Sequence, residues 1–209
     1  MGFMRPSGGS RPVIRGLVLA GGKSSRFGSN KAVARYQGVR LIERAVSLLN
    51  ALDLKPVVAV RKGMNYPFLK CATVYDKLPD LGPLEGIYTA MSIFKNTSFL
   101  VLTCDMPALT RTLLLNLLKS HESSCLVTIY STQGLEMQPF PGVYESALLE
   151  TIRERLKQGD LSMHRLLESA PARKVIPWRG DPAVFSNINH KEDIPPLARL
   201  SFTFPFFLL

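Results

Sequence analysis

The 209-residue chain is 46% hydrophobic and 20% charged, a balance typical of a globular protein, which excludes disorder, collagen and coiled coil as descriptions of the whole chain. No apolar run reaches the roughly 18 residues that a membrane span requires, so no span is expected. Residues 1–62 carry 12 Lys and Arg against the two acids Glu43 and Asp53, which accounts for the net charge of +10 and favours an anionic partner near this end.

Strand-like and helix-like segments alternate from residue 14 onward, with short apolar runs followed by segments of helical apolar spacing. In chain order, we expect a strand at 14–20, a helix at 41–52, a strand at 57–60, a helix at 84–94, a strand at 99–103, a helix from the N-cap Thr110 to residue 119, strands at 126–130 and 142–144, helices at 146–157 and 162–169, and a strand at 174–176. This alternation is typical of βαβ units. It predicts an α/β fold with a mostly parallel central sheet and helices on both faces.

The segment 14–195 is predicted to be a single domain, since it shows neither an internal repeat nor a low-complexity tract. A flexible leader at 1–13 precedes it, and an apolar tail at 196–209 follows it, which we expect to dock on the domain or to form a dimer contact. The cysteines Cys71, Cys104 and Cys125 are too few and too scattered for a disulfide framework, which favours a reducing cytoplasm.

Three loops with unusual residues begin after Leu19, Tyr75 and Thr103. Ligands of open parallel sheets bind beyond the carboxyl ends of the strands. We therefore expect these three loops to lie along one rim of the sheet and to form the ligand site together.

The first of these loops, residues 19–31, combines three glycines with three cations and contains no acid. Gly21 and Gly22 allow the backbone to bend sharply and to bring its N–H groups onto an anion. Lys23, Arg26 and Lys31 would repel one another without such an anion, although the loop could also be an ordinary solvated one. Its spacing matches neither G-x-x-x-x-G-K-[ST] nor G-x-G-x-x-G, which disfavours a Walker NTPase and a classical dinucleotide-binding fold.

The other two loops each offer a carboxylate. Asp105 comes just after a buried strand and suits Mg²⁺, which takes one or two carboxylates together with phosphate oxygens and water. The alternative for Asp105 is a turn or a helix cap before Pro107. Asp76 opens the loop 76–86, where it could accept hydrogen bonds from a base or a ribose hydroxyl, and the glycine-rich helix start that follows could offer backbone donors.

Several short motifs run along the chain in an order known from one family: LAGG at 19–22, SRFG at 25–28 with KA at 31–32, GPLxG at 82–86, CDMP at 104–107, QP at 138–139 and FxNxN at 185–189. Each motif is weak alone, but as a set they resemble the molybdenum cofactor guanylyltransferase family, which belongs to the wider nucleotidyltransferase group. The resemblance covers about residues 16–193. LAGG looks like the guanylyl branch, whereas cytidylyl relatives commonly show LAAG.

The resemblance implies a three-layer, Rossmann-like nucleotidyltransferase fold. It also implies an enzyme that uses Mg²⁺ to transfer GMP from GTP to molybdenum-molybdopterin, forming molybdopterin guanine dinucleotide and releasing pyrophosphate. Transient contacts with molybdenum cofactor synthesis proteins or acceptor molybdoenzymes would follow from this activity. The family pattern places the nucleotide at Leu19, Ala20, Gly21, Lys31, Asp76 and Asp105, the metal at Asp105, and the pterin side at Gln138, Asn187 and Asn189.

The implied reaction is consistent with the residues present, because a phosphate monoester nucleophile is already ionised at neutral pH and needs no general base. The reaction requires instead that charge be neutralised on the transferred α-phosphoryl group and on the leaving pyrophosphate. We assign this work to Arg26, Lys31 and a Mg²⁺ on Asp105, together with the backbone N–H groups of Gly21 and Gly22.

Three positions depart from the family pattern. Asn30 stands where the family usually has Asp, His190 stands where it has Thr, and Arg61 follows the strand at 57–60, where relatives can have Asn. The first two leave open a non-catalytic nucleotide or cofactor carrier. Within the same fold, the alternatives are a CTP:molybdopterin or a sugar-phosphate nucleotidyltransferase. A nucleic-acid surface is disfavoured, because the cations at 23–31 lie in a glycine loop and are not interleaved with stacking aromatics.

Overall fold

The computed structural model describes residues 13–22, 27–76, 81–132 and 136–195, and contains a seven-stranded sheet. In spatial order the strands are β5 (Ala72–Tyr75), β4 (Val57–Val60), β1 (Val13–Leu19), β6 (Thr97–Thr103), β8 (Met137–Tyr144), β7 (Val127–Ser131) and β9 (Arg173–Pro177). Only β8 runs antiparallel to its neighbours, β6 and β7, within this sheet. The predicted, mostly parallel sheet is thereby confirmed. The predicted leader, except Val13, and the predicted tail lie outside the described residues.

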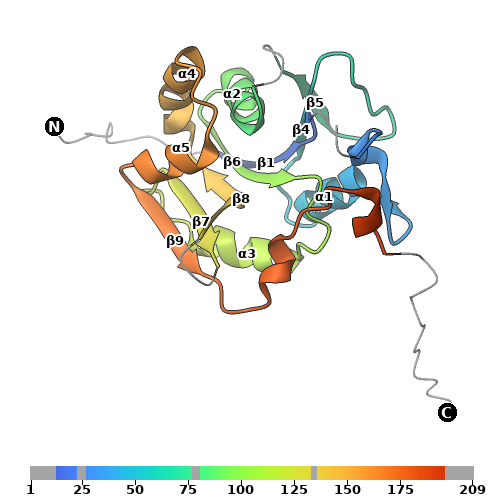
Figure 1. Ribbon diagram of the computed structural model, residues 1–209. Coiled ribbons are helices and arrows are strands. Elements are labelled where there is room, and N and C mark those ends of the chain that lie inside the picture. Colours follow the sequence, from blue (N-terminus) through green and yellow to red (C-terminus); the bar gives the residue numbers. More distant parts are fainter. Residues whose placement is uncertain (1–12, 23–26, 77–80, 133–135, 196–209) are drawn as a thin grey trace.

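Helices cover both faces of the sheet, as predicted. Successive side chains of a strand point to opposite faces, so a strand that is apolar throughout needs helices packed against both. Figure 1 shows α1 (Leu41–Asn50) and α3 (Arg111–Ser120) below the sheet, and α2 (Pro83–Ile93), α4 (Leu149–Lys157) and α5 (Met163–Ser169) above it. In β6, Leu100 and Leu102 pack toward α1 and α3, whereas Phe99 and Val101 pack toward the other three helices. Within the described residues, no helix is long and apolar enough to cross a bilayer.

Most predicted elements are present, with differences at their ends. Thr110 caps α3 as predicted, since its Oγ1 accepts a hydrogen bond from Leu113 N at 3.2 Å. The segment predicted as one helix at 146–157 begins with a 3₁₀ turn, η2 (Ser146–Leu148), before α4. Two parts of the sheet are not among the predicted strands. One is β5, an edge strand in which Val74 is the one buried residue, and the other is residues 137–141 of β8, which include two prolines. A short hairpin of β2 (Arg35–Tyr36) and β3 (Val39–Arg40) was not expected either.

The register of the parallel strands aligns their carboxyl ends. Leu19 at the end of β1 pairs with Ala59 of β4 on one side and with Thr103 of β6 on the other. Val60 at the end of β4 pairs with Tyr75 at the end of β5. The loops after Leu19, Tyr75 and Thr103 therefore leave the sheet at one edge, as the sequence predicts.

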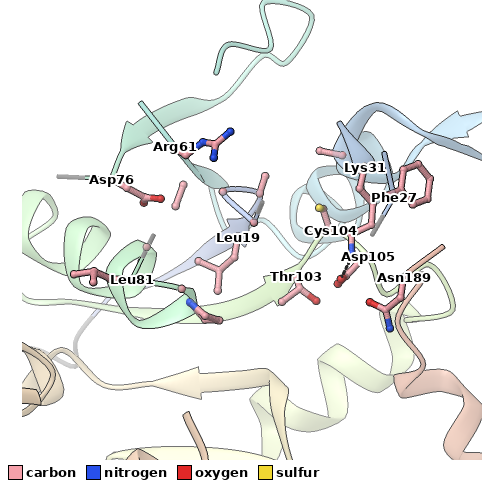
Figure 2. A pocket seen from close by; sticks show the side chains of 18 residues that line it. Leu19, Phe27, Lys31, Arg61, Asp76, Leu81, Thr103, Cys104, Asp105 and Asn189 are labelled. Carbon is pink, nitrogen blue, oxygen red and sulfur yellow. Dashed lines mark hydrogen bonds and ion pairs between the residues drawn. The ribbon is translucent and has the colours of Figure 1, made fainter. Parts of the chain in front are cut away.

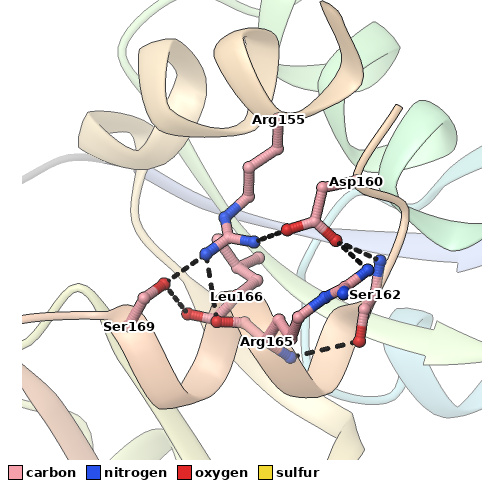
Figure 3. A network of polar contacts seen from close by, with 6 residues as sticks. All are labelled: Arg155, Asp160, Ser162, Arg165, Leu166 and Ser169. Atoms are coloured by element: carbon pink, nitrogen blue, oxygen red, sulfur yellow. Dashed lines mark hydrogen bonds and ion pairs between the residues drawn. The ribbon is translucent and has the colours of Figure 1, made fainter. Parts of the chain in front are cut away.

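A polar network fixes the joint between α4 and α5 on the upper face (Figure 3). Arg155 of α4 forms an ion pair with Asp160 in the connecting loop and donates to Arg165 O at 3.1 Å and Ser169 Oγ at 2.5 Å. Asp160 also pairs with Arg165 Nη2 at 2.7 Å and accepts a hydrogen bond from Ser162 N at 3.3 Å. The network ties the connecting loop to both helices.

Candidate functional site

A cleft of about 400 Å³ lies at the edge of the sheet where β1, β4, β5 and β6 end. Its walls come from the loops after these strands, from the start of α2 and from the segment near residue 189 (Figure 2). The cleft is lined by Leu19, Ala20, Gly21, Gly22, Phe27, Lys31, Ala32, Ala59, Arg61, Asp76, Leu81, Gly82, Pro83, Gly86, Thr103, Cys104, Asp105 and Asn189. It thus brings together all the residues predicted at the nucleotide. Arg26, which was predicted to be catalytic, lies outside the described residues.

The charged side chains divide the cleft into two flanks. Figure 2 shows Arg61 and Asp76 on one flank, Lys31 and Asp105 on the opposite flank, and Leu19 between them. Each flank therefore pairs a cation with a carboxylate, and the end of β1 with its glycine loop forms the floor between them.

Gly21 in this floor has no room for a side chain. A Cβ at this position would lie 2.7 Å from Asp76 Oδ2 and 3.3 Å from Arg61 N, so an alanine would displace the Asp76 carboxylate. At Gly22, by contrast, an added Cβ would meet nothing within 4 Å. The bare backbone of this loop allows a ligand to approach closely.

Asn30 holds the short helix that carries Lys31. The helix is the 3₁₀ turn η1 (Lys31–Val33), and Asn30 Oδ1 caps it by accepting hydrogen bonds from Ala32 N and from Tyr66 Oη, both at 3.1 Å. Both bonds end on a neutral amide oxygen. Asn30 therefore caps η1 without placing a negative charge beside Lys31.

Lys31 and Asp105 form the closest ion pair of the cleft. Lys31 Nζ lies 2.6 Å from Asp105 Oδ2 and donates a second hydrogen bond to Ile188 O at 2.9 Å. The amide of Ile188 in turn donates to Asp105 O at 2.8 Å. Lys31 therefore links three segments far apart in the sequence: η1, the loop after β6 and the Asn187–Asn189 segment.

The second carboxylate oxygen of Asp105 has a different environment. Asp105 Oδ1 is buried and has no hydrogen-bond partner in the described part of the chain, and the same holds for Thr103 Oγ1 in the same wall. A buried carboxylate oxygen without a donor suits a hard cation. Among the described residues, no group of three or more His, Cys, Asp or Glu is placed to hold a metal ion.

Asp76 is the acceptor of the opposite flank. Burial, with a smaller contribution from the carboxylate of Glu85, raises the pKa of Asp76 to about 6. Its Oδ1 is buried and has no hydrogen-bond partner among the described residues. Donors from a ligand would satisfy this oxygen and stabilise the ionised form.

Cys104 is the thiol of the cleft wall, next to Asp105. Burial, and then the charge of Asp105, raise the pKa of the Cys104 thiol to about 12. The thiolate is the nucleophilic form of cysteine, so this side chain is inert at neutral pH. The described cleft thus offers charges and hydrogen-bond groups rather than a covalent nucleophile.

A second cavity, of about 690 Å³, adjoins the cleft beyond Asn189, which lines both. It is lined by Tyr36, Pro107, Ala108, Ala183, Ser186, Asn187, Ile188, Asn189, His190 and Asp193. Asp193 shapes its rim by accepting hydrogen bonds from Asn189 N at 2.7 Å and His190 N at 2.8 Å. His190 takes part in this turn through its backbone N–H.

The structure does not bring all predicted pterin-side residues together. Asn187 and Asn189 lie at the second cavity, whereas Gln138 lies in β8, donates to Thr132 Oγ1 at 3.3 Å and lines neither cavity. Sequence reasoning also did not assign roles to Arg61 and Thr103, which line the cleft. Their positions at strand ends could have indicated that they line the cleft, since Arg61 follows β4 directly and Thr103 is the last residue of β6.

Comparison with known proteins gives one consistent family. Residues 16–175 match the family model of the MobA-like NTP transferase domain. The chain is 31% identical to a probable molybdenum cofactor guanylyltransferase of Thermococcus sibiricus over 86% of this chain and 94% of that protein, and 29% identical to the molybdenum cofactor guanylyltransferase of Serratia proteamaculans over 86% and 91%. Its fold is similar to that of molybdopterin-guanine dinucleotide biosynthesis protein A from Archaeoglobus fulgidus, with a TM-score of 0.73, 21% identity and coverage of 86% of this chain and 94% of that one.

We predict that the Lys31–Asp105 pair stabilises the nucleotide-free fold. Lys31→Met should lower the free energy of unfolding by about 1–3 kcal/mol, because it leaves a largely buried carboxylate without its cation. Adding Asp105→Asn should recover part of this loss, with a coupling energy of about 1 kcal/mol or more in a double-mutant cycle. Urea unfolding without nucleotide or metal measures both effects. Strictly additive losses would show that the pair is not energetically coupled.

Proposed function

The chain belongs to the MobA-like NTP transferase family, and we propose that it transfers GMP from GTP to molybdopterin, forming molybdopterin guanine dinucleotide and pyrophosphate. The observation that carries this proposal is the cleft that joins a glycine loop, Lys31, Asp76 and Asp105 at one edge of the sheet. Its two flanks provide separate places for a base and for phosphates. The chain covers 94% of the probable molybdenum cofactor guanylyltransferase of Thermococcus sibiricus and 91% of the molybdenum cofactor guanylyltransferase of Serratia proteamaculans, which supports the same activity for this chain.

The proposed nucleotide pose follows from the charges. The triphosphate lies over the backbone of Gly21 and Gly22, where N–H groups can approach phosphate oxygens without side-chain interference. Lys31, whose ammonium group has three N–H donors, adds a positive charge from the Asp105 flank. The base lies toward Asp76, because a carboxylate there accepts from base N–H groups and repels phosphate.

Asp105 is the proposed ligand of Mg²⁺. The oxygen that fits the metal is Oδ1, which is buried and without a donor, and an oxygen ligand is what Mg²⁺ prefers. A bound Mg²⁺ neutralises negative charge on the phosphate oxygens. The family's general use of a divalent metal supports this assignment.

The reaction needs an ionised phosphate on molybdopterin as the nucleophile. One of its oxygens forms a bond to the α-phosphorus of GTP, while the bond from this phosphorus to the oxygen bridging to the β-phosphorus breaks, and pyrophosphate leaves with the electron pair. Lys31 and the N–H groups of Gly21 and Gly22 stabilise the charge that develops on the transferred group and on the leaving group. A general base is not required.

The second cavity is the proposed site for the pterin. It adjoins the cleft on the Asp105 flank through Asn189, so an acceptor phosphate there would face the α-phosphate. Asn187 and Asn189 are the proposed pterin contacts at this cavity.

The product must then reach an enzyme that uses it, so we also propose transient contacts with cofactor-synthesis proteins or acceptor molybdoenzymes. The three cysteines are free, and the proposed location is the cytoplasm.

The activity itself can be tested by pyrophosphate release from each nucleoside triphosphate, with Mg²⁺ and with or without molybdopterin. We expect release with GTP and molybdopterin together, little release with CTP, and loss of release in Asp105→Asn, because this variant lacks the charge that holds the metal. Release with CTP instead of GTP would indicate the cytidylyl branch. Tight GTP binding without release would indicate a carrier rather than an enzyme.

A second prediction concerns pH. Because the pKa of Asp76 is about 6, the carboxylate is ionised above this pH and protonated below it. The ionised form accepts two N–H groups from guanine, so GTP affinity should fall as the pH drops, by on the order of tenfold from pH 7 to pH 5. Calorimetric titration of wild type and Asp76→Asn measures this, because the variant keeps the titration of the GTP phosphates but lacks that of Asp76. Identical pH profiles for the two proteins would contradict the role of Asp76.

A further inference from the structure

Arg61 and Asp76 leave the sheet side by side. They directly follow Val60 and Tyr75, which are paired in the register of β4 and β5, and Asp76 N donates to Val60 O at 2.9 Å. Both side chains line the cleft, on the flank opposite Lys31 and Asp105 (Figure 2). Arg61 is thus built into the wall that already holds the proposed acceptor of the base.

The two side chains offer complementary hydrogen-bond groups. The guanidinium of Arg61 carries five N–H donors in a planar fork and no acceptor, whereas the ionised carboxylate of Asp76 only accepts. A phosphate is disfavoured at the Asp76 side chain itself, because this carboxylate is half-buried, its Oδ1 has no hydrogen-bond partner among the described residues, and its negative charge would repel a phosphate. The ligand that fits is therefore a neutral group with acceptors and donors on neighbouring atoms.

Guanine has this pattern. Its O6 and N7 are neighbouring acceptors, the edge that arginine binds most often in specific nucleic-acid complexes. Its N1–H and 2-amino group are donors that continue the edge past O6. Adenine has the opposite hydrogen-bond groups at positions 6 and 1. Its 6-amino group is a donor where guanine has the acceptor O6, and its unprotonated N1 is an acceptor where guanine has a donor.

We propose that Arg61 is a specificity-determining residue that donates to O6 and N7 of guanine while Asp76 accepts from N1–H and the 2-amino group. This inference rests on the proposed function and adds Arg61, beside Asp76, as a second residue that distinguishes GTP from ATP. Arg61 has donors only, so it selects for acceptors at positions 6 and 7 of the purine, while Asp76 selects for the donors at positions 1 and 2.

The test compares three nucleotides, each measured with wild type and with three variants. GTP and inosine triphosphate both have O6 and N7, inosine triphosphate lacks the 2-amino group, and ATP lacks O6, while all three share the ribose and the triphosphate. Arg61→Met removes the donors, and Lys62→Met removes the same charge from the next residue, which is exposed and does not line the cleft. Dissociation constants with Mg²⁺ are measured by calorimetry on the full chain.

We expect wild type and Lys62→Met to bind GTP and inosine triphosphate more tightly than ATP. Arg61→Met should lose roughly 10- to 100-fold in affinity for GTP and for inosine triphosphate, and less than about threefold for ATP. Arg61→Lys, which keeps the charge but not the fork, should show a smaller loss with the same selectivity. Arg61→Lys also serves as the test variant if Arg61→Met does not fold.

An equal loss for all three nucleotides would overturn the proposal, because it would place Arg61 on the shared ribose or phosphates. Unchanged affinity for GTP would overturn it as well. A wild-type protein that binds GTP no more tightly than ATP would contradict the proposed function itself. The two failures are therefore distinguishable within one set of titrations.

Discussion

β1 lies between β4 and β6, parallel to both, and the rest of the site depends on this pairing. Leu19 is in register with Ala59 on one side and Thr103 on the other, so β1 and β6 end at the same level and β4 ends one residue further along. The register is stabilised by burial, since Leu17 and Val18 of β1 pack into cores on opposite faces of the sheet. A shift by one residue would exchange these faces and separate the glycine loop from Asp105.

Within this frame, two carboxylates have different electrostatic environments and therefore suit different ligands. Asp105 is paired with the ammonium of Lys31 at 2.6 Å and keeps one buried oxygen available, which suits a metal and phosphates. Asp76 is half-buried near Glu85, its pKa is raised to about 6, and it lies beside Arg61, which follows the neighbouring strand, and this environment suits a base. The separation of the two flanks gives the nucleotide a direction in the cleft.

Much of this site could be predicted from the sequence, because strand ends and short motifs are local features. The order of strands and helices indicated a parallel sheet, and the sheet edge then brought Gly21, Lys31, Asp76 and Asp105 together as expected. The contacts between distant segments could not be predicted. Lys31 and Asp105 are 74 residues apart, and Lys31 and Ile188 are 157 apart, so their pairing depends on packing that no local pattern encodes.

Two further residues show the same limit. Gln138 was grouped with Asn187 and Asn189 by motif, but it lies on β8 and contacts Thr132. Arg61 was noted at the sequence level only for the asparagine that it replaces, and its place in the cleft wall emerged from the pairing of β4 with β5. The β5 strand gave no apolar pattern, because edge strands bury few side chains.

The most direct measurement is a crystal structure of the chain with Mg²⁺ and a GTP analogue that cannot be cleaved between its α- and β-phosphates. We predict that the guanine lies against Arg61 and Asp76, that the phosphates lie on the backbone of Gly21 and Gly22, and that the metal contacts Asp105 Oδ1. A guanine on the Asp105 flank, or a nucleotide bound in the second cavity, would contradict this arrangement.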